Sequence, residues 1–181
     1  LKLLTENHVY SKEMEHDACG VGLIASTEGK KSRAVVEYGI EALKAVWHRG
    51  AVDADGKTGD GAGIHVEIPK DFFIEKIQVT GHDYDNSEIC VGMIFLPRND
   101  YSAQENCKTI VESELTKNNF SIYGWRQVPV NPKVLGEKAL QTMPEIIQVL
   151  FKSNDPNLLD KNLERKIYET RKRIENKAFE A

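Results

Sequence analysis

The sequence predicts a mixed fold, α/β or α+β, in which helices cover a sheet. Short apolar runs that end at a proline or a glycine alternate with stretches whose apolar residues recur every three or four positions. Hydrophobic residues make up 40% and charged residues 29% of the 181 residues, the ordinary balance of a globular domain. Strand-like and helix-like patterns in alternation, with enough apolar residues for a core, indicate a layered arrangement.

The composition excludes several classes of protein. There is no apolar run of about 18 residues, as a membrane-spanning helix needs. The net charge is −4 without a basic cluster, which gives no surface for nucleic acid. The three cysteines, at 19, 90 and 107, form no CxxC pair and cannot all pair, so we expect free thiols and a reducing compartment, the cytoplasm. The five histidines lack the spacing of a zinc site.

In the first part of the chain, the apolar run 21–25 predicts a buried strand. A helix follows, with Ser32 as its N-cap and Gly50 at its end. Its apolar face consists of Val36, Ile40, Leu43 and Trp47. Residues 54–63 form a glycine-rich loop, and the alternating residues 64–68 predict a strand that Pro69 ends.

The second part of the chain predicts six more elements. They are a helix over 70–78, a strand over 89–96, a helix that opens at 102–105, strands over 120–130 and 145–151, and a helix over about 160–178. The third of these begins with Ser102 and Glu105 at the spacing of a capping box. Its predicted buried face consists of Ala103, Cys107, Ile110, Val111 and Leu115.

Two residues have side chains suited to chemistry. Cys19 stands before a predicted strand and is followed by Gly20 and Gly22, which let a substrate or another backbone approach closely. A cysteine in that place is either a nucleophile or a small buried hydrophobic residue. Arg49, in the triplet HRG, either stabilises the end of the helix or binds a carboxylate through its two-pronged guanidinium. Position alone does not decide either case.

The glycine-rich loop does not fit a phosphate-binding loop. A P-loop places Lys and Ser or Thr after its glycines and opens a helix. Here Lys57 and Thr58 precede the last glycines and a strand is predicted next. Glycines that permit a tight turn between packed elements explain the pattern better.

Four segments together resemble a known family. HDACGVGLIA at 16–25, ALKAVWHRGAVDADGKTGDGAGIHVEIP at 42–69, WRQVPVNPKVLGEKALQTMPEIIQVLF at 125–151 and ERKIYETRKRIE at 164–175 resemble the N-terminal glutaminase domain of glutamate synthases. That domain is a class II glutamine amidotransferase with the fold of the N-terminal nucleophile hydrolases. The resemblance implies a four-layer αββα sandwich, incomplete in this chain.

The resemblance also implies roles for single residues. It places a cleavage between Ala18 and Cys19, so residues 1–18 are expected to be a propeptide-like leader and residues 19–181 the first part of the amidotransferase domain. Cys19 is then the nucleophile, and the α-amine that cleavage frees is its base. Arg49 is expected to bind the α-carboxylate of glutamine. The remaining expected pocket residues are Gly20, Thr58, Gly59 and Asp60.

For the whole protein, the resemblance implies that ammonia passes to a second site and aminates 2-oxoglutarate with FMN and an iron–sulfur cluster, neither of which these 181 residues are expected to hold. The implied partners are glutamine, the remaining domains of the subunit and a small NADPH-oxidising subunit.

The sequence departs from the family pattern, because the leader is attached and no HNGE string with oxyanion donors occurs. We therefore expect a piece of a longer protein, inactive alone. Another class II amidotransferase, or a non-catalytic module with the same fold, remains an alternative.

Overall fold

The computed structural model describes residues 20–181. These residues form two compact units. The first contains the chain up to Asp53 together with Gly59–Val66, and the second contains Ala54–Thr58 together with Glu67–Ala181. The second unit therefore includes the tip of the glycine-rich loop.

The first unit contains helix α2 (Arg33–Ala45) and the 3-10 turn η1 (Trp47–Arg49). The predicted cap is confirmed, since the Ser32 hydroxyl accepts a hydrogen bond from the Ala34 amide at 3.1 Å. Gly50 ends the turn by donating its amide hydrogen to the Trp47 carbonyl at 3.0 Å. The helix thus stops where the sequence predicted, but its last residues tighten into a 3-10 turn.

The strands predicted over 21–25 and 64–68 are wrong, because neither segment lies in a strand. A strand needs a neighbour for its backbone N–H and C=O groups. Within the described residues of this unit, the β pairing is a single bridge between Val52 and Gly59. Val21 is 93% exposed and Leu23 is 88% exposed. Apolar patterning alone therefore does not make these segments strands.

The second unit is built on a three-stranded antiparallel sheet. Its strands are β1 (Cys90–Leu96), β2 (Phe120–Gln127) and β3 (Glu145–Ser153), in the order β1-β3-β2. All three were predicted, although β2 ends three residues early, two residues before Pro129, which has no N–H for the ladder. With helices around an antiparallel sheet, the described residues have the predicted α+β character.

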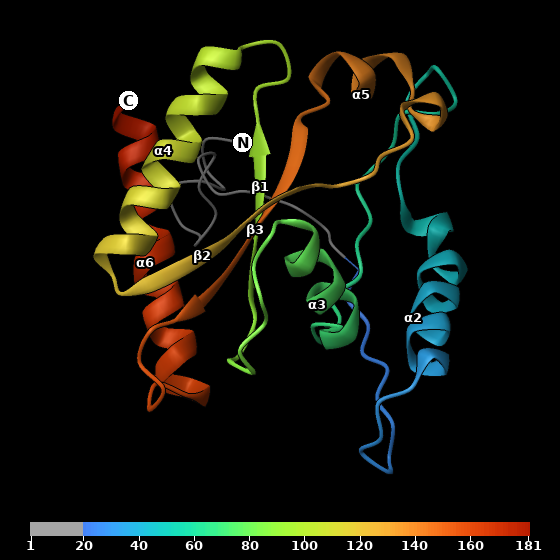
Figure 1. The fold of residues 1–181 in the computed structure, drawn as a ribbon. Coiled ribbons are helices and arrows are strands. Elements are labelled where there is room, and N and C mark those ends of the chain that lie inside the picture. Colours follow the sequence, from blue (N-terminus) through green and yellow to red (C-terminus); the bar gives the residue numbers. More distant parts are fainter. Residues whose placement is uncertain (1–19) are drawn as a thin grey trace, which may run out of the picture. The chain divides into compact units, whose positions relative to one another are not determined.

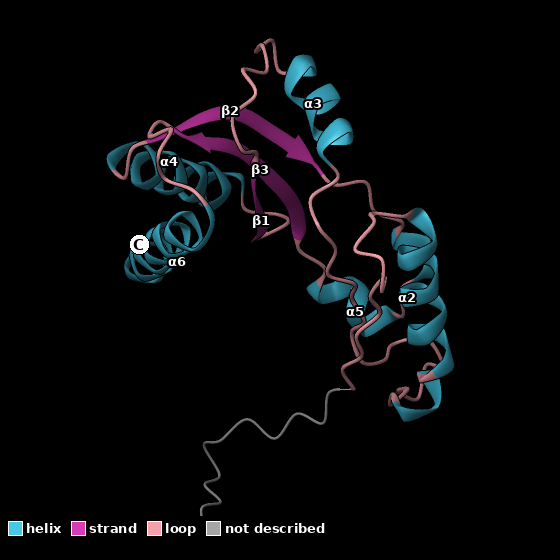
Figure 2. Ribbon diagram, turned by 90° about the horizontal axis from the view of Figure 1, so that it is seen from below, coloured by secondary structure: helices cyan, strands magenta, loops and turns pink. Residues whose placement is uncertain are grey.

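Helices cover both faces of this sheet (Figures 1 and 2). Helices α4 (Tyr101–Lys117) and α6 (Asp160–Glu180) lie side by side on one face, and α3 (Lys70–Val79) lies on the other. Successive side chains of β3 point to opposite faces of the sheet, which explains the two cores. Val149 and Phe151 pack toward α4 and α6, while Leu150 packs toward α3. The first core contains Cys90, Val111, Leu115, Phe120 and Leu163, and the second contains Phe73, Ile77, Ile89 and Tyr123.

The start of α4 differs from the capping box predicted at Ser102. The N-cap is Asp100, whose carboxylate accepts a hydrogen bond from the Ala103 amide at 2.9 Å. An aspartate two positions earlier satisfies the same free amides, so the helix begins sooner. Along this helix Val111 and Leu115 are buried as predicted.

A β-bulge in β2 lets α3 approach the sheet. The register shifts between Ile122 and Gly124, which leaves Tyr123 as the extra residue. Gly124 has φ +147°, and a Cβ there would lie 2.7 Å from the Cγ2 methyl of Thr80. The Tyr123 hydroxyl donates to Asp85, and the burial of Tyr123 together with this carboxylate raises the pKa of the phenol above its usual range.

Two short elements lie between β2 and β3. They are the 3-10 turn η2 (Pro132–Val134) and helix α5 (Glu137–Thr142). The sequence did not predict either, because three and six residues are too few for an apolar stripe to repeat.

Candidate active site

The predicted nucleophile, Cys19, lies outside the described residues. The next residue, Gly20, is exposed. A Cβ at Gly20 would have no described heavy atom within 4 Å, so packing among these residues does not require a glycine there.

The HRG triplet forms the tight turn that follows α2. The ring of His48 contacts the Ala45 carbonyl through Nδ1 at 3.2 Å. Because a carbonyl oxygen only accepts, Nδ1 is the protonated nitrogen in this contact. The backbone of Arg49 belongs to the turn that Gly50 ends. The position of the Arg49 side chain lies outside what the structure describes.

Gly59 and Asp60 are fixed directly beside the residues that follow this turn. The Asp60 carboxylate accepts a hydrogen bond from the Ala51 amide at 2.8 Å, and the Asp60 amide donates to the Ala51 carbonyl at 3.2 Å. A Cβ at Gly59 would lie only 2.8 Å from that carbonyl, so only glycine fits. The structure therefore brings two of the predicted pocket residues next to Gly50, the last residue of the HRG triplet.

Thr58 has a different partner, the carboxylate of Asp55. One Asp55 oxygen accepts from the backbone amides of Lys57 at 2.9 Å and Thr58 at 2.7 Å. The other accepts from the Thr58 hydroxyl at 2.5 Å and from the Glu137 amide at 3.1 Å. Opposite this carboxylate lies Gly136, which is buried. The loop is thus attached to a segment about 80 residues further along the chain.

Sequence reasoning missed Asp55 and Gly136. A local signal for Asp55 exists, because an aspartate that is followed two and three residues later by free amides is typical of an Asx turn. No local signal exists for Gly136, since its neighbours in space come from a distant part of the sequence.

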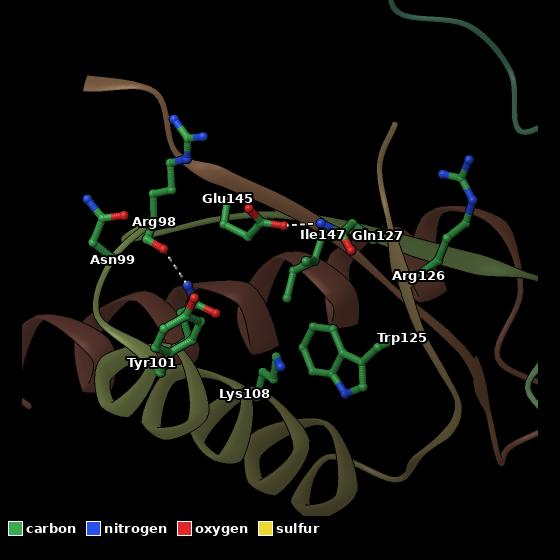
Figure 3. Close-up of a pocket in the computed structure, with 10 residues that line it drawn as sticks. Arg98, Asn99, Tyr101, Lys108, Trp125, Arg126, Gln127, Glu145 and Ile147 are labelled. Atoms are coloured by element: carbon green, nitrogen blue, oxygen red, sulfur yellow. Dashed lines mark hydrogen bonds between the residues drawn. The ribbon is translucent and has the colours of Figure 1, made fainter. Parts of the chain in front are cut away.

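A cavity of about 620 Å³ lies on the α4 side of the sheet and contains none of the predicted site residues (Figure 3). The residues that line it are Arg98, Asn99, Tyr101, Gln104, Lys108, Trp125, Arg126, Gln127, Glu145 and Ile147. Its polar groups mainly bind one another or the backbone: Gln127 donates to Glu145, and Gln104 donates to the Arg98 carbonyl at 3.2 Å.

The cations of this cavity do not converge. Figure 3 shows the guanidinium groups of Arg98 and Arg126 pointing away from its centre. Arg126 donates to Gln148 at 2.7 Å and lies over the ring of Phe72. Lys108 pairs with Glu105 at 2.7 Å. A ligand would meet no common set of donors here, so the glycine-rich loop and the HRG turn remain the candidate site.

Comparison with known proteins identifies the family of the chain. Residues 19–181 match the class-II glutamine amidotransferases. The chain belongs to this family. The match begins at Cys19 and includes the HRG turn and the glycine-rich loop.

The amidotransferase chain is similar to glutamate synthases from several organisms. It is 55% identical over 172 residues to the glutamate synthase [NADPH] large chain of Azospirillum brasilense, covering 95% of this chain and 11% of that protein. It is 38% identical over 175 residues to the ferredoxin-dependent glutamate synthase of Pyropia yezoensis, covering 96% and 11%. Ferredoxin-dependent glutamate synthase 1 of Arabidopsis thaliana is 40% identical over 162 residues, covering 89% and 10%. The chain thus spans about a tenth of the length of these relatives.

The other two cysteines of this amidotransferase lie in or near its core. Cys90 is 4% exposed, and burial raises the pKa of its thiol to about 12. Cys107 is half-buried on α4. Both thiols are free. Among the described residues, no three or more His, Cys, Asp or Glu side chains are grouped as a metal site would require. No helix in this part of the chain has the length and hydrophobicity needed to cross a membrane.

Proposed function

We propose that this class II amidotransferase chain is the glutaminase part of a glutamate synthase, which releases ammonia from glutamine and uses it to aminate 2-oxoglutarate. The observation that carries the proposal is the 55% identity, over 95% of the chain, to a glutamate synthase large chain. The relatives differ in the electron donor that their names state, NADPH or ferredoxin, so the proposal leaves the donor open.

Cys19 is the proposed nucleophile of a two-step hydrolysis. Removal of residues 1–18 turns its backbone nitrogen into an α-amine, and the match that starts at Cys19 supports this boundary. With pKa values near 7.7–8.0, α-amines accept protons close to neutral pH. The amine takes the thiol proton, and the sulfur attacks the side-chain amide carbon of glutamine. The C–N bond breaks, the nitrogen leaves with a proton as ammonia, and water hydrolyses the γ-glutamyl thioester to glutamate and free thiol.

The pocket for glutamine is proposed to include Gly20, the guanidinium of Arg49, and the residues Thr58, Gly59 and Asp60. A guanidinium binds a carboxylate through two parallel hydrogen bonds, which fixes one end of the substrate. The contacts of Asp60 with Ala51, two residues after Arg49, support this grouping. Arg49→Lys keeps the charge but removes the two-pronged geometry, so we expect a higher KM for glutamine with a smaller change in kcat.

A four-layer αββα sandwich is the proposed complete fold. The face of β1 that shares α3's side of the sheet is only partly covered. Phe95 is 63% exposed and Met93 is 50% exposed on this face. Large apolar side chains gathered on a sheet face favour a further layer. Oxidative footprinting of the whole enzyme tests this, because Met93 is then protected; full reactivity would contradict the fourth layer.

The cofactors of the second reaction are expected elsewhere in the longer protein. Iron–sulfur clusters are held by about four cysteine thiolates, and this chain has three cysteines, of which Cys90 is buried in a core. These residues therefore do not fit a cluster, and FMN is likewise assigned to the domains beyond. The proposed partners are those domains and a small NADPH-oxidising subunit, in the cytoplasm.

The test replaces Cys19 by alanine in the full-length enzyme, with Cys107→Ala as the matched control. The Cys19 variant is expected to lose ammonia release from glutamine while it still forms glutamate from added ammonia. The control is expected to keep both reactions. N-terminal sequencing of the natural protein is expected to find Cys19 as its first residue. Unchanged glutamine hydrolysis in the Cys19 variant would refute the proposal.

A further inference from the structure

We propose that Asp55 is a positioning residue of the glutaminase: it attaches the tip of the glycine-rich loop to the start of α5 and thereby holds Thr58 in place. The inference rests on the proposed function, because that function gives Thr58 a substrate to face. The attachment itself is a property of the described structure.

The Asp55 carboxylate joins two distant segments through four donors. Three belong to its own loop: the backbone amides of Lys57 and Thr58, and the Thr58 hydroxyl. The fourth is the backbone amide of Glu137, 82 residues away. The local bonds shape the turn, and the distant one determines where the turn is held.

Helix α5 is built to receive this carboxylate. Its N-cap residue is Gly136, which has no side chain to cap the helix. The first amides of a helix need an acceptor, and Asp55 supplies it for Glu137 from another part of the chain. A Cβ at Gly136 would lie 2.5 Å from the Thr58 amide nitrogen and would also strike the side chains of Asp55 and Thr58. Glycine is therefore required for the loop to approach.

The charge of Asp55 fits a structural acceptor and does not fit an acid–base group. The hydrogen bond from the Thr58 hydroxyl, and then those from the Lys57 and Thr58 amides, lower the pKa of Asp55 to about 2, although the residue is exposed. A carboxyl group with so low a pKa stays ionised near neutral pH and neither donates nor shuttles a proton there. Its function is to accept hydrogen bonds continuously.

The loop is held at its base as well as at its tip. At the base, Asp60 pairs with Ala51 through backbone and side chain, and Gly59 forms a bridge with Val52. In the chain, Thr58 comes directly before Gly59. Loss of the bond to Glu137 removes a hydrogen bond between the tip and the start of α5. Displacement of binding groups by about 1 Å costs up to 10²-fold in rate.

The experiment compares four variants of the full-length enzyme. Asp55→Asn keeps an oxygen for the amides of Lys57 and Thr58 but presents an NH₂ group to the Glu137 amide and to the Thr58 hydroxyl. The hydroxyl can accept from this group, whereas the Glu137 amide cannot. Gly136→Ala obstructs the same contact from the other segment. The double variant combines them. Asp155→Asn is the control, because the Asp155 carboxylate accepts from the Asn157 amide at 2.9 Å in a turn of the same kind.

Three measurements are made on each variant: hydrogen exchange over residues 54–60, kcat and KM for glutamine, and glutamate formation from added ammonia. Each single variant is expected to exchange faster in this segment and to have a kcat/KM about tenfold to 10²-fold lower, mainly through KM, with ammonia-dependent activity retained. The double variant is expected to be no worse than the more severe single one, because both substitutions break the same link between the loop tip and the start of α5. The control is expected to match the parent.

The inference is overturned if Asp55→Asn leaves exchange over 54–60 unchanged, if faster exchange leaves kcat/KM unchanged, or if the two effects multiply in the double variant. A parent enzyme without glutaminase activity would instead refute the proposed function. Hydrogen exchange would still test the attachment of the loop in that case, so the two failures are distinguishable.

Discussion

Alkylation of the three cysteines should separate the proposed nucleophile from the structural thiols. The reactive form of cysteine is the thiolate. Burial raises the pKa of Cys90 to about 12, so at pH 8 only about one molecule in 10⁴ carries a thiolate there. An ordinary exposed thiol with a pKa of about 8.5 is about one-quarter ionised at the same pH. The difference in thiolate population alone is therefore about 10³-fold, and the 4% exposure of Cys90 slows reaction further.

The assay is a time course with iodoacetamide on the native full-length enzyme at pH 8, read by peptide mass spectrometry. Cys19 is expected to react first and to be protected by glutamine, while Cys90 reacts only after denaturation in urea. Urea also supplies the control, because all three cysteines should then react at similar rates. Labelling of native Cys90 at a rate within tenfold of Cys19 would refute the burial argument. Labelling of Cys19 without loss of glutaminase activity would refute its proposed role.

Three further predictions follow from the described residues and the motifs. Replacing Leu150, which is 0% exposed in the centre of β3, by alanine should lower the free energy of unfolding by about 2–5 kcal/mol in urea titration, and a loss below 1 kcal/mol would contradict its core position. The 181 residues by themselves, with the leader attached and without an HNGE string, should release no ammonia from glutamine above background; turnover that disappears in Cys19→Ala would contradict this. Hydrogen exchange over 54–60, corrected for its intrinsic pH dependence, should be constant from pH 8 to 5. The exchange rate should rise only as the pH falls from about 4 to about 2. The lowered pKa keeps the Asp55 carboxylate ionised above this range, so its contribution to stability is lost only within it. A rise in exchange near pH 6 would show that another group controls the loop.

Local patterns predicted the helices well. The Ser32 cap of α2, the apolar strands β1 and β3, and the long charged helix α6 are confirmed. The predicted apolar face of α2 is only half-buried, and its last member, Trp47, lies in η1 and is 74% exposed. Each of these elements is determined by residues that lie close together in the sequence, so a short window of sequence is enough to predict it.

Patterns that need a distant partner were less informative. The apolar runs 21–25 and 64–68 resemble strands in composition, yet the structure describes no ladder for them. The sequence pattern did not predict the bulge at Tyr123, since the bulge depends on how closely the end of α3 packs against Gly124. Pairing between strands is decided by neighbours that a single stretch of sequence does not contain.

The sequence by itself determined the chemistry proposed for this amidotransferase. Cys19, the HRG triplet and the glycine-rich loop are recognisable because residue type and spacing are local properties of the chain. Only the tertiary structure decided how that loop is held. The bond from Asp55 to Glu137 and the close approach at Gly136 join positions about 80 residues apart. A contact between such positions depends on the path of all the chain between them, and it leaves no periodic pattern from which it could be predicted.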